Sequence, residues 1–139
     1  MDQNIIEERI LRIRKNLREL EKLRQVSERD FLEDYISQSA AERLLETSIQ
    51  AAIDIGAHLI AEKRLESPAE YRQVFEILGK HGLLPLELVT KLVQAAGLRN
   101  RLAHAYLDLD SEKIHQFLHS SLGDFEEYCR IILTLIQKD

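Results

Sequence analysis

The sequence predicts an all-α domain, folded as an up-and-down antiparallel bundle of four to five main helices. Apolar residues recur at steps of three and four along most of the chain. The 5 glycines and 2 prolines are too few for the tight turns of a β-sandwich or barrel. The 139 residues, 45% hydrophobic and 31% charged, suffice to bury one core but not to build a multi-domain enzyme. We therefore expect residues 1–139 to form one domain.

The first predicted helix follows the N-terminal apolar stripe. Ile6, Ile10, Ile13, Leu17 and Leu20 are separated by alternating steps of four and three. This spacing is typical of a helix that packs nearly parallel to a neighbour. Because such seams are long in this chain, we also expect a twofold homodimer.

A long helical stretch is predicted next, from Phe31 to about Leu65. Ser27 and Asp30 have the spacing of an N-terminal capping signal just before it. Polar residues in its first part predict a break near Ser37–Ser39.

The central part of the chain has two helix starts marked by proline. Ser67-Pro68-Ala69-Glu70 combines an N-cap serine, a proline at the first helical position and a glutamate that closes a capping box. It predicts a short helix that ends at Gly79. Pro85 begins the next predicted helix, which continues toward His104.

The last predicted helix begins at Asp110 or Ser111, either of which is a suitable cap. The single cysteine, Cys129, lies in its apolar run and cannot form an intrachain disulfide. We expect a buried thiol that acts as a small hydrophobic side chain, in a reducing compartment. The apolar stripe of this helix comprises Ile114, Phe117, Leu118, Leu122, Phe125, Tyr128, Ile132 and Leu135.

The charge balance limits the kind of partner that the chain can bind. The 19 Lys and Arg against 24 Asp and Glu give a net charge of −5, which argues against wrapping nucleic acid by bulk electrostatics. Any nucleic-acid contact is therefore expected to be local. Because Asp2, Glu7 and Glu8 stand where an apolar leader would, and no long apolar run follows, we expect a cytoplasmic protein without a membrane partner.

One dense polar cluster remains, the octet Arg99-Asn100-Arg101-Leu102-Ala103-His104-Ala105-Tyr106. An imidazole can take or give a proton near neutral pH, and a guanidinium grips phosphate in a fork, so His104 and Arg99 suit acid–base chemistry on a phosphate group. The alternative without a function is that Arg99, Arg101 and His104 interact favourably with the dipole at a helix C-terminus. Tyr106 would then be an aromatic residue at the edge of the core.

Helix geometry complicates this pairing. Five residues at about 100° each place Arg99 and His104 about 140° apart, so either the arginine reaches around the helix or the helix deforms. Gly97 would permit a local distortion or the close approach of a partner helix. One histidine does not readily act as both base and acid, whereas two facing copies do, so the expected dimer would complete the site.

The octet resembles the HEPN superfamily, and within it the HepT-like (DUF86) toxins, whose motif is Arg-x4-His-x-Tyr with a polar residue after the arginine. The segment Ile53–Ile60 is also similar to their central helix. The resemblance implies that Arg99 and His104 are the catalytic pair of a metal-independent endoribonuclease and that Asn100 supports the site. It further implies that an MNT-type nucleotidyltransferase antitoxin modifies Tyr106 with AMP.

The expected protein is thus the ribonuclease toxin of a toxin–antitoxin pair. It would act on RNA at a homodimer interface without a cofactor or metal, with Arg101 and Asp54 as further supporting residues. Two alternatives stay open. One is a non-catalytic helical adaptor that presents RNA or another substrate to a nucleotidyltransferase, with the octet as docking surface, and the other is a plain structural dimer.

Two other polar pairs need an interpretation. Asp54 and His58 are spaced i,i+4 in an apolar run, which favours a buried, mutually satisfied pair over a pair that orients the site. Glu112 and His115 match the Glu-x-x-His element of di-iron bundles, but such a bundle needs this element twice and the second copy is absent from the sequence. A solvated helix start is the favoured interpretation, and no metal site is expected.

Overall fold

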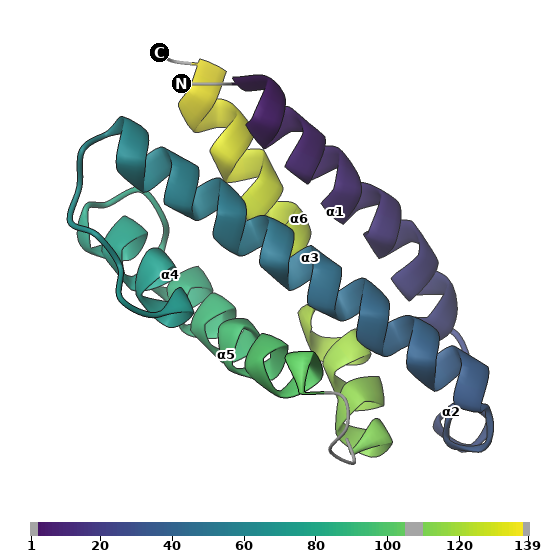
Figure 1. Ribbon diagram of the computed structural model, residues 1–139. Helices are drawn as coiled ribbons and strands as arrows, with labels where there is room; N and C mark the ends of the chain where they lie inside the picture. The colour runs from purple at the N-terminus through teal and green to yellow at the C-terminus, as the bar shows by residue number, and fades with distance from the viewer. Residues whose placement is uncertain (1–2, 105–109, 138–139) are drawn as a thin grey trace.

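The structure is a computed structural model that describes residues 3–104 and 110–137. All six helices within these ranges belong to one bundle, in which α1, α3 and α6 are long and run side by side (Figure 1). The all-α bundle with five main helices is confirmed, with one additional short helix, α2. The helices are α1 (Gln3–Arg24), α2 (Glu28–Glu33), α3 (Tyr35–Glu62), α4 (Tyr71–Lys80), α5 (Leu86–Ala103) and α6 (Ser111–Gln137).

Helix α3 lies at the centre of the bundle and contacts each of the other five helices. Helices α1 and α6 pack on it and on each other, while α4 and α5 form a second pair against it (Figure 1). The buried hydroxyl of Tyr128 on α6 donates a hydrogen bond of 2.8 Å to the carbonyl of Ala52 on α3. Four aromatic side chains are fully buried in this core: Phe31, Phe75, Phe125 and Tyr128.

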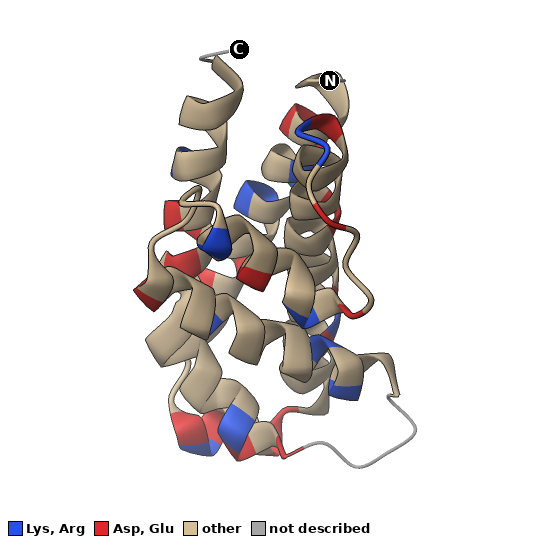
Figure 2. Ribbon diagram, turned by 90° about the vertical axis from the view of Figure 1, so that its left-hand side faces the viewer, with Lys and Arg blue, Asp and Glu red and all other residues tan. Residues whose placement is uncertain are grey.

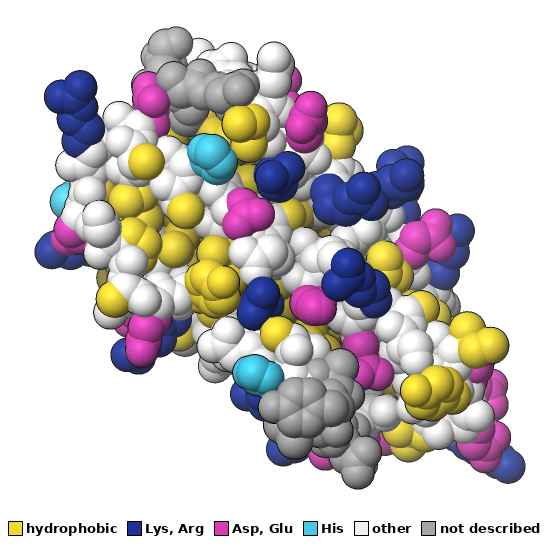
Figure 3. Space-filling view, in the orientation of Figure 1, with side chains coloured by type: hydrophobic (Ala, Val, Ile, Leu, Met, Phe, Trp, Pro, Cys, Tyr) yellow, Lys and Arg dark blue, Asp and Glu magenta, His cyan; other side chains and the backbone are white. Residues whose placement is uncertain are grey.

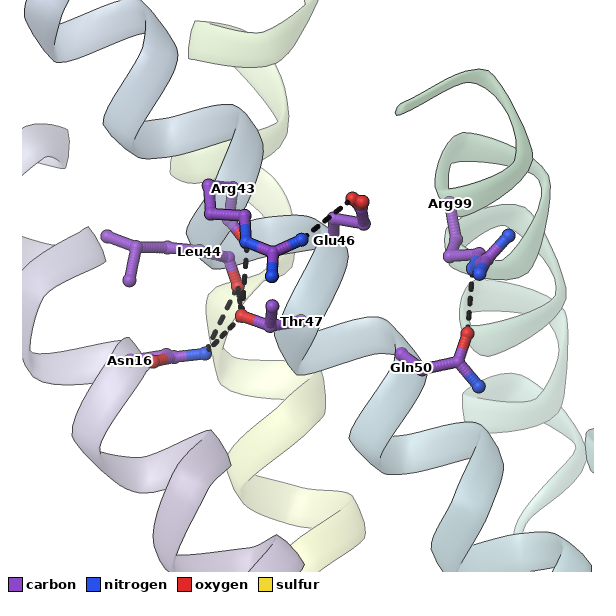
Figure 4. A network of polar contacts seen from close by, with 7 residues as sticks. All are labelled: Asn16, Arg43, Leu44, Glu46, Thr47, Gln50 and Arg99. Carbon is purple, nitrogen blue, oxygen red and sulfur yellow. Dashed lines mark hydrogen bonds and ion pairs between the residues drawn. The ribbon is translucent and has the colours of Figure 1, made fainter. Parts of the chain in front are cut away.

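The predicted stripe of α1 faces the core, with Leu17 partly buried and its other four members buried. Among them lies the amide of Asn16, which is only 3% exposed. Its Nδ2 donates to Thr47 Oγ1 on α3 at 2.9 Å (Figure 4). It also donates to Ser48 Oγ on the same helix, at 3.0 Å. Because a buried amide is costly unless bonded, these contacts fix where α1 sits along α3.

The predicted break near Ser37–Ser39 is wrong by a few residues, because the chain bends at Asp34. That residue is the C-cap of α2 and the N-cap of α3. Its Oδ2 accepts a hydrogen bond from the hydroxyl of Ser37, and its Oδ1 accepts from the backbone N–H groups of Ser37 and Ile36. The hydroxyl bond first, and then the backbone bonds, keep the pKa of its carboxyl below the usual value. A strong N-cap three residues upstream of the serines therefore starts the new helix earlier.

The predicted start of α4 at Ser67 and Pro68 is also wrong, since the helix begins at Tyr71 with Glu70 as N-cap. The side chain of Gln73 accepts hydrogen bonds from the backbone N–H groups of Ala69 and Glu70, at 2.6 and 3.1 Å. Ser67 with Glu70 and Glu70 with Gln73 have the same capping-box spacing, and the helix uses the second pair.

The predicted starts of the last two helices are confirmed, whereas α3 ends at Glu62, three residues before the predicted Leu65. Pro85 is the N-cap residue of α5, and Asp110 Oδ1 accepts from the backbone of Glu112 and Lys113 at the start of α6. Cys129 is completely buried, as predicted, and burial raises the pKa of its thiol to about 12. It therefore packs as a neutral, unreactive group.

Charged residues are distributed over the whole bundle. Figure 2 shows basic and acidic positions interspersed along the helices rather than separated by sign. The space-filling view of the face in Figure 1 shows the same mixture, so no broad basic surface covers that face (Figure 3). In the described part of the chain, no helix is long and apolar enough to cross a membrane.

A pair of glycines tests this packing. A methyl group at Gly56 on α3 would collide with Val74 and lie 3.1 Å from the hydroxyl of Tyr128, whereas one at Gly123 on α6 would meet nothing within 4 Å. We expect Gly56→Ala to lower the free energy of unfolding by about 1–3 kcal/mol, because overpacking strains a close-packed core. Urea denaturation measures this change.

The matched control is Gly123→Ala, which gains helix propensity without a clash and should be neutral or stabilising by up to about 1 kcal/mol. An equal effect of the two substitutions would contradict the close approach of α4 and α6 to α3 at Gly56.

Candidate active site

Helix α5 carries the described part of the octet on its last turn and a half. Arg99 is half-buried, while Asn100, Arg101 and His104 are exposed. Tyr106 lies outside the described residues. The buried Leu98 and Leu102 hold this helix end against the bundle, so the polar groups are presented from a rigid element.

The guanidinium of Arg99 has two partners from other helices. Its Nε donates a hydrogen bond of 2.8 Å to Oε1 of Gln50 on α3 (Figure 4). Its Cζ lies over the ring of Tyr71, 5.0 Å from the ring centroid, at the first residue of α4. A bonded Nε and a stacked plane fix the orientation of the guanidinium, and its terminal nitrogens are the groups that suit a phosphate.

Asp54 belongs to the same network. Gln50 Nε2 donates to Asp54 Oδ1 at 2.9 Å, and Arg9 Nε on α1 lies 3.5 Å from Asp54 Oδ2. The expected buried pair of Asp54 with His58 is wrong, because Asp54 is half-buried and His58 is exposed. Helix α3 turns both side chains toward its open side, and Asp54 bonds one turn back along the helix to Gln50.

The end of α5 departs from ideal helix geometry between Arg99 and His104. The helix is regular through Gly97, and ends at Ala103 with His104 as its C-cap. The backbone of His104 has φ −102° and ψ 56°, and its N–H donates to the carbonyl of Arg101 at 3.2 Å, one residue closer than in an α-helix. The helix therefore deforms at its last turn, and the histidine is no longer bound by ideal helix geometry.

Arg101 lies on a different side of α5 from the partners of Arg99. It lines a hollow between α5 and α6, together with Asp110, Lys113 and Phe117. The structure thus brings Arg99, Gln50 and Asp54 together and places Arg101 apart from that network. No contact of Arg101 with Gln50 or Tyr71 is found among the described residues, so its expected supporting role stays a prediction.

The favoured interpretation of Glu112 and His115 as a solvated helix start is wrong for the histidine. His115 is only 4% exposed, its Nε2 lies 2.9 Å from the carbonyl of Val26, and its ring contacts those of Phe31 and His119. It therefore joins α6 to the turn between α1 and α2. Within residues 3–104 and 110–137, no three His, Cys, Asp or Glu side chains gather as metal ligands would.

Gln50 and Tyr71 are the two residues that sequence reasoning missed. The only local signal was the i,i+4 spacing of Gln50 and Asp54, which allows a side-chain hydrogen bond on one helix face. No spacing along the chain indicates that either residue meets Arg99, since Gln50 is 49 residues away in sequence.

The all-helical bundle is the fold that the resemblance of the octet to the HEPN superfamily implied. The family model described as "Ribonuclease HepT-like" matches residues 13–132. The "tRNA nuclease HepT" of Aphanizomenon flos-aquae is 36% identical over 130 residues, covering 92% of this chain and 87% of that protein. The "mRNA nuclease HepT" of Shewanella oneidensis is 28% identical over 102 residues, covering 73% and 77%.

The chain therefore belongs to the HepT-like ribonuclease family, as the octet indicated. Solved structures agree in fold. A tri-AMPylated Shewanella oneidensis HEPN toxin, solved in complex with an MNT antitoxin, matches with a TM-score of 0.87 at 25% identity, covering 96% of this chain and 99% of that one. A toxin–antitoxin crystal structure with AMP-PNP matches with a TM-score of 0.88 at 24% identity, covering 94% and 98%.

The contacts of Gln50 generate a prediction. We expect Gln50→Ala to lower RNA cleavage by about tenfold to a hundredfold, because an arginine released from its partner spends less time in the reactive orientation. Loss of one half-buried hydrogen bond should change the free energy of unfolding by no more than about 1.5 kcal/mol. Steady-state cleavage rates and urea denaturation measure the two effects separately.

Two further variants complete this experiment. Gln50→Glu combined with Asp54→Asn exchanges donor and acceptor between the two side chains, so an oxygen still faces Arg99 Nε and activity should be largely retained. Gln25→Ala, an exposed glutamine remote from α5, is the neutral control. Equal activity of Gln50→Ala and Gln25→Ala would show that the bond to Arg99 is dispensable.

Proposed function

We propose that this chain is a metal-independent endoribonuclease toxin whose site is built from Arg99 and His104 of two copies. The observation that carries the proposal is the guanidinium of Arg99, fixed by Gln50 and Tyr71 beside the exposed Asn100 and His104. The relatives named tRNA and mRNA nuclease support the same chemistry.

Each residue has a defined task in this proposal. One imidazole accepts the proton of the ribose 2′-hydroxyl as that oxygen attacks the neighbouring phosphorus. A second, protonated imidazole gives its proton to the 5′-oxygen as the bond from phosphorus to that oxygen breaks. Arg99 balances the charge of the phosphorane, and Asn100 contributes an amide that both donates and accepts hydrogen bonds. Asp54 acts on Arg99 through Gln50 and is a positioning residue.

A homodimer follows from the same proton balance. Each chain brings one histidine to the octet, while the reaction uses a base and an acid at once. A twofold axis near the end of α5 would place two such histidines on either side of one phosphodiester.

An RNA cleavage assay in EDTA tests the catalytic proposal. The purified native chain should cut RNA without metal, and His104→Ala should lower the rate by about a hundredfold or more, because the proton carrier is removed. His58→Ala is the matched control, since His58 is an exposed histidine on α3 with no place in the proposed site. Equal losses in the two variants would rule out a special role for His104.

The adaptor remains the second candidate function, favoured by the solved complex of a HEPN toxin with an MNT antitoxin. It predicts that neither the native chain nor His104→Ala cleaves RNA, and that both bind an MNT-type nucleotidyltransferase stably. The cleavage assay and a pull-down with that enzyme therefore separate the two functions.

We further propose that an MNT-type nucleotidyltransferase antitoxin attaches AMP to Tyr106 and thereby inactivates the chain. The phosphate would lie two residues from His104, where its negative charge repels the RNA backbone. Incubation with the antitoxin and ATP should add AMP to the native chain and abolish cleavage, with mass spectrometry as the measurement.

Tyr106→Phe should accept no AMP at that position and should stay active after the same incubation. Tyr35→Phe, which changes a tyrosine that is 80% exposed on α3, is the matched control and should be inactivated like the native chain. RNA cleavage that persists on fully modified native chain would refute inhibition by AMP.

A further inference from the structure

An open cleft lies beside the candidate active site, between the start of α4 and the outer face of α5. The residues of α5 that line it share one face of the helix, because they are spaced at i, i+3, i+4 and i+7. The cleft is lined by Ala69, Glu70, Tyr71 and Arg72 on one side and by Val93, Ala96, Gly97 and Asn100 on the other.

The α5 side of this cleft, its floor, consists of small apolar residues followed by one polar residue. Val93, Ala96 and Gly97 leave little side-chain bulk along α5, and a methyl group placed on Gly97 would meet only Arg101 Nη1, at 4.0 Å. Asn100, at the end of the same stripe, is exposed and offers both a donor and an acceptor. A slot with these properties suits a flat ring that carries hydrogen-bonding groups on its edge.

The opposite wall supplies an aromatic surface. The ring of Tyr71 is 40% exposed, although the guanidinium of Arg99 lies over it. Glu70 adds no uncompensated negative charge, because its carboxylate is 2.8 Å from Arg72 Nε. Arginine and tyrosine planes are the surfaces on which proteins stack unpaired bases of single-stranded RNA.

We propose that this cleft is a subsite for one nucleobase of the RNA substrate, in a nucleotide that flanks the scissile phosphate. The inference rests on the proposed function, because Arg99 is taken as the group that holds that phosphate. Tyr71 stacks on the base, the small residues of α5 form its floor, and Asn100 bonds to its edge. Since Tyr71, which lines the cleft, also contacts the guanidinium of Arg99, a base seated on its ring aligns the adjacent phosphate with that guanidinium.

The test follows a base in RNA directly, without relying on cleavage. Short RNAs carry the fluorescent base 2-aminopurine at successive positions and are bound to the His104→Ala variant, so that they stay intact. Stacking in the cleft should quench the fluorescence at one position, next to the bond that the native chain cuts. A second substitution, Gly97→Leu, fills the floor of the cleft and should abolish this quenching, while Gly97→Ala, which adds only one methyl group, should keep it.

Cleavage by proteins with native His104 gives the second readout. For native RNA, Gly97→Leu should raise KM by about tenfold relative to Gly97→Ala, because stacking of one base is worth roughly 1–3 kcal/mol, or about 5- to 150-fold. For RNA with an abasic ribose at the quenched position, the two variants should be equal. Circular dichroism checks that both are folded.

The possible failures are distinguishable. In one outcome, quenching is lost with Gly97→Leu and kept with Gly97→Ala, but the native chain does not cleave RNA. That result would support the base subsite and overturn the proposed ribonuclease mechanism. Cleavage without position-specific quenching would overturn the subsite alone. A Gly97→Leu effect of equal size on intact and abasic RNA would also overturn it, and would instead indicate that the cleft contacts a second copy of the chain.

Discussion

The five helices α1, α2, α4, α5 and α6 all pack on α3, and the rest of the structure depends on this constraint. Where Gly56 lacks a side chain, Val74 of α4 and Tyr128 of α6 approach the α3 backbone closely. This approach places the start of α4, and with it Tyr71, beside α5. One turn and a half before Gly56 on α3, Gln50 meets Arg99 from the same helix. The core helix therefore determines both the packing of the bundle and the orientation of its candidate catalytic arginine.

Amide side chains make several of the hydrogen bonds between the helices. Asn16 ties α1 to α3 through the hydroxyls of Thr47 and Ser48. Gln50 bonds to the carboxylate of Asp54 on its own helix and to the guanidinium of Arg99 on α5, and Figure 4 shows the second of these bonds. Amides suit this position because they donate and accept at once without adding charge to a poorly solvated place. In the described ranges, no buried side-chain nitrogen or oxygen lacks a hydrogen-bond partner. The bundle thus places polar groups between its helices while every described one is satisfied.

The sequence predicted features that depend on neighbours along the chain and missed those that depend on packing. The stripes of α1 and α6, the start at Pro85 and the octet itself were visible because each is local. The start of α4 was misplaced because Ser67 to Glu70 and Glu70 to Gln73 have the same capping spacing, and burial of Val74 and Phe75 decides between them. Asp54 was misread because its apolar neighbours suggested a helix buried all round. Gln50 and Tyr71 reach Arg99 only through the folded bundle.

The end of α5 places the two key side chains in different surroundings. Arg99 sits within the helix, held from two sides, so displacing it would disrupt contacts to α3 and α4. His104 is the residue at which the helical backbone stops, and its side chain is exposed. In the proposed reaction, negative charge accumulates around one phosphorus, whereas protons are exchanged at two oxygens on opposite sides of it. A half-buried guanidinium at the centre of the charge and an exposed imidazole beside solvent would match that asymmetry, and one helix terminus presents both, five positions apart.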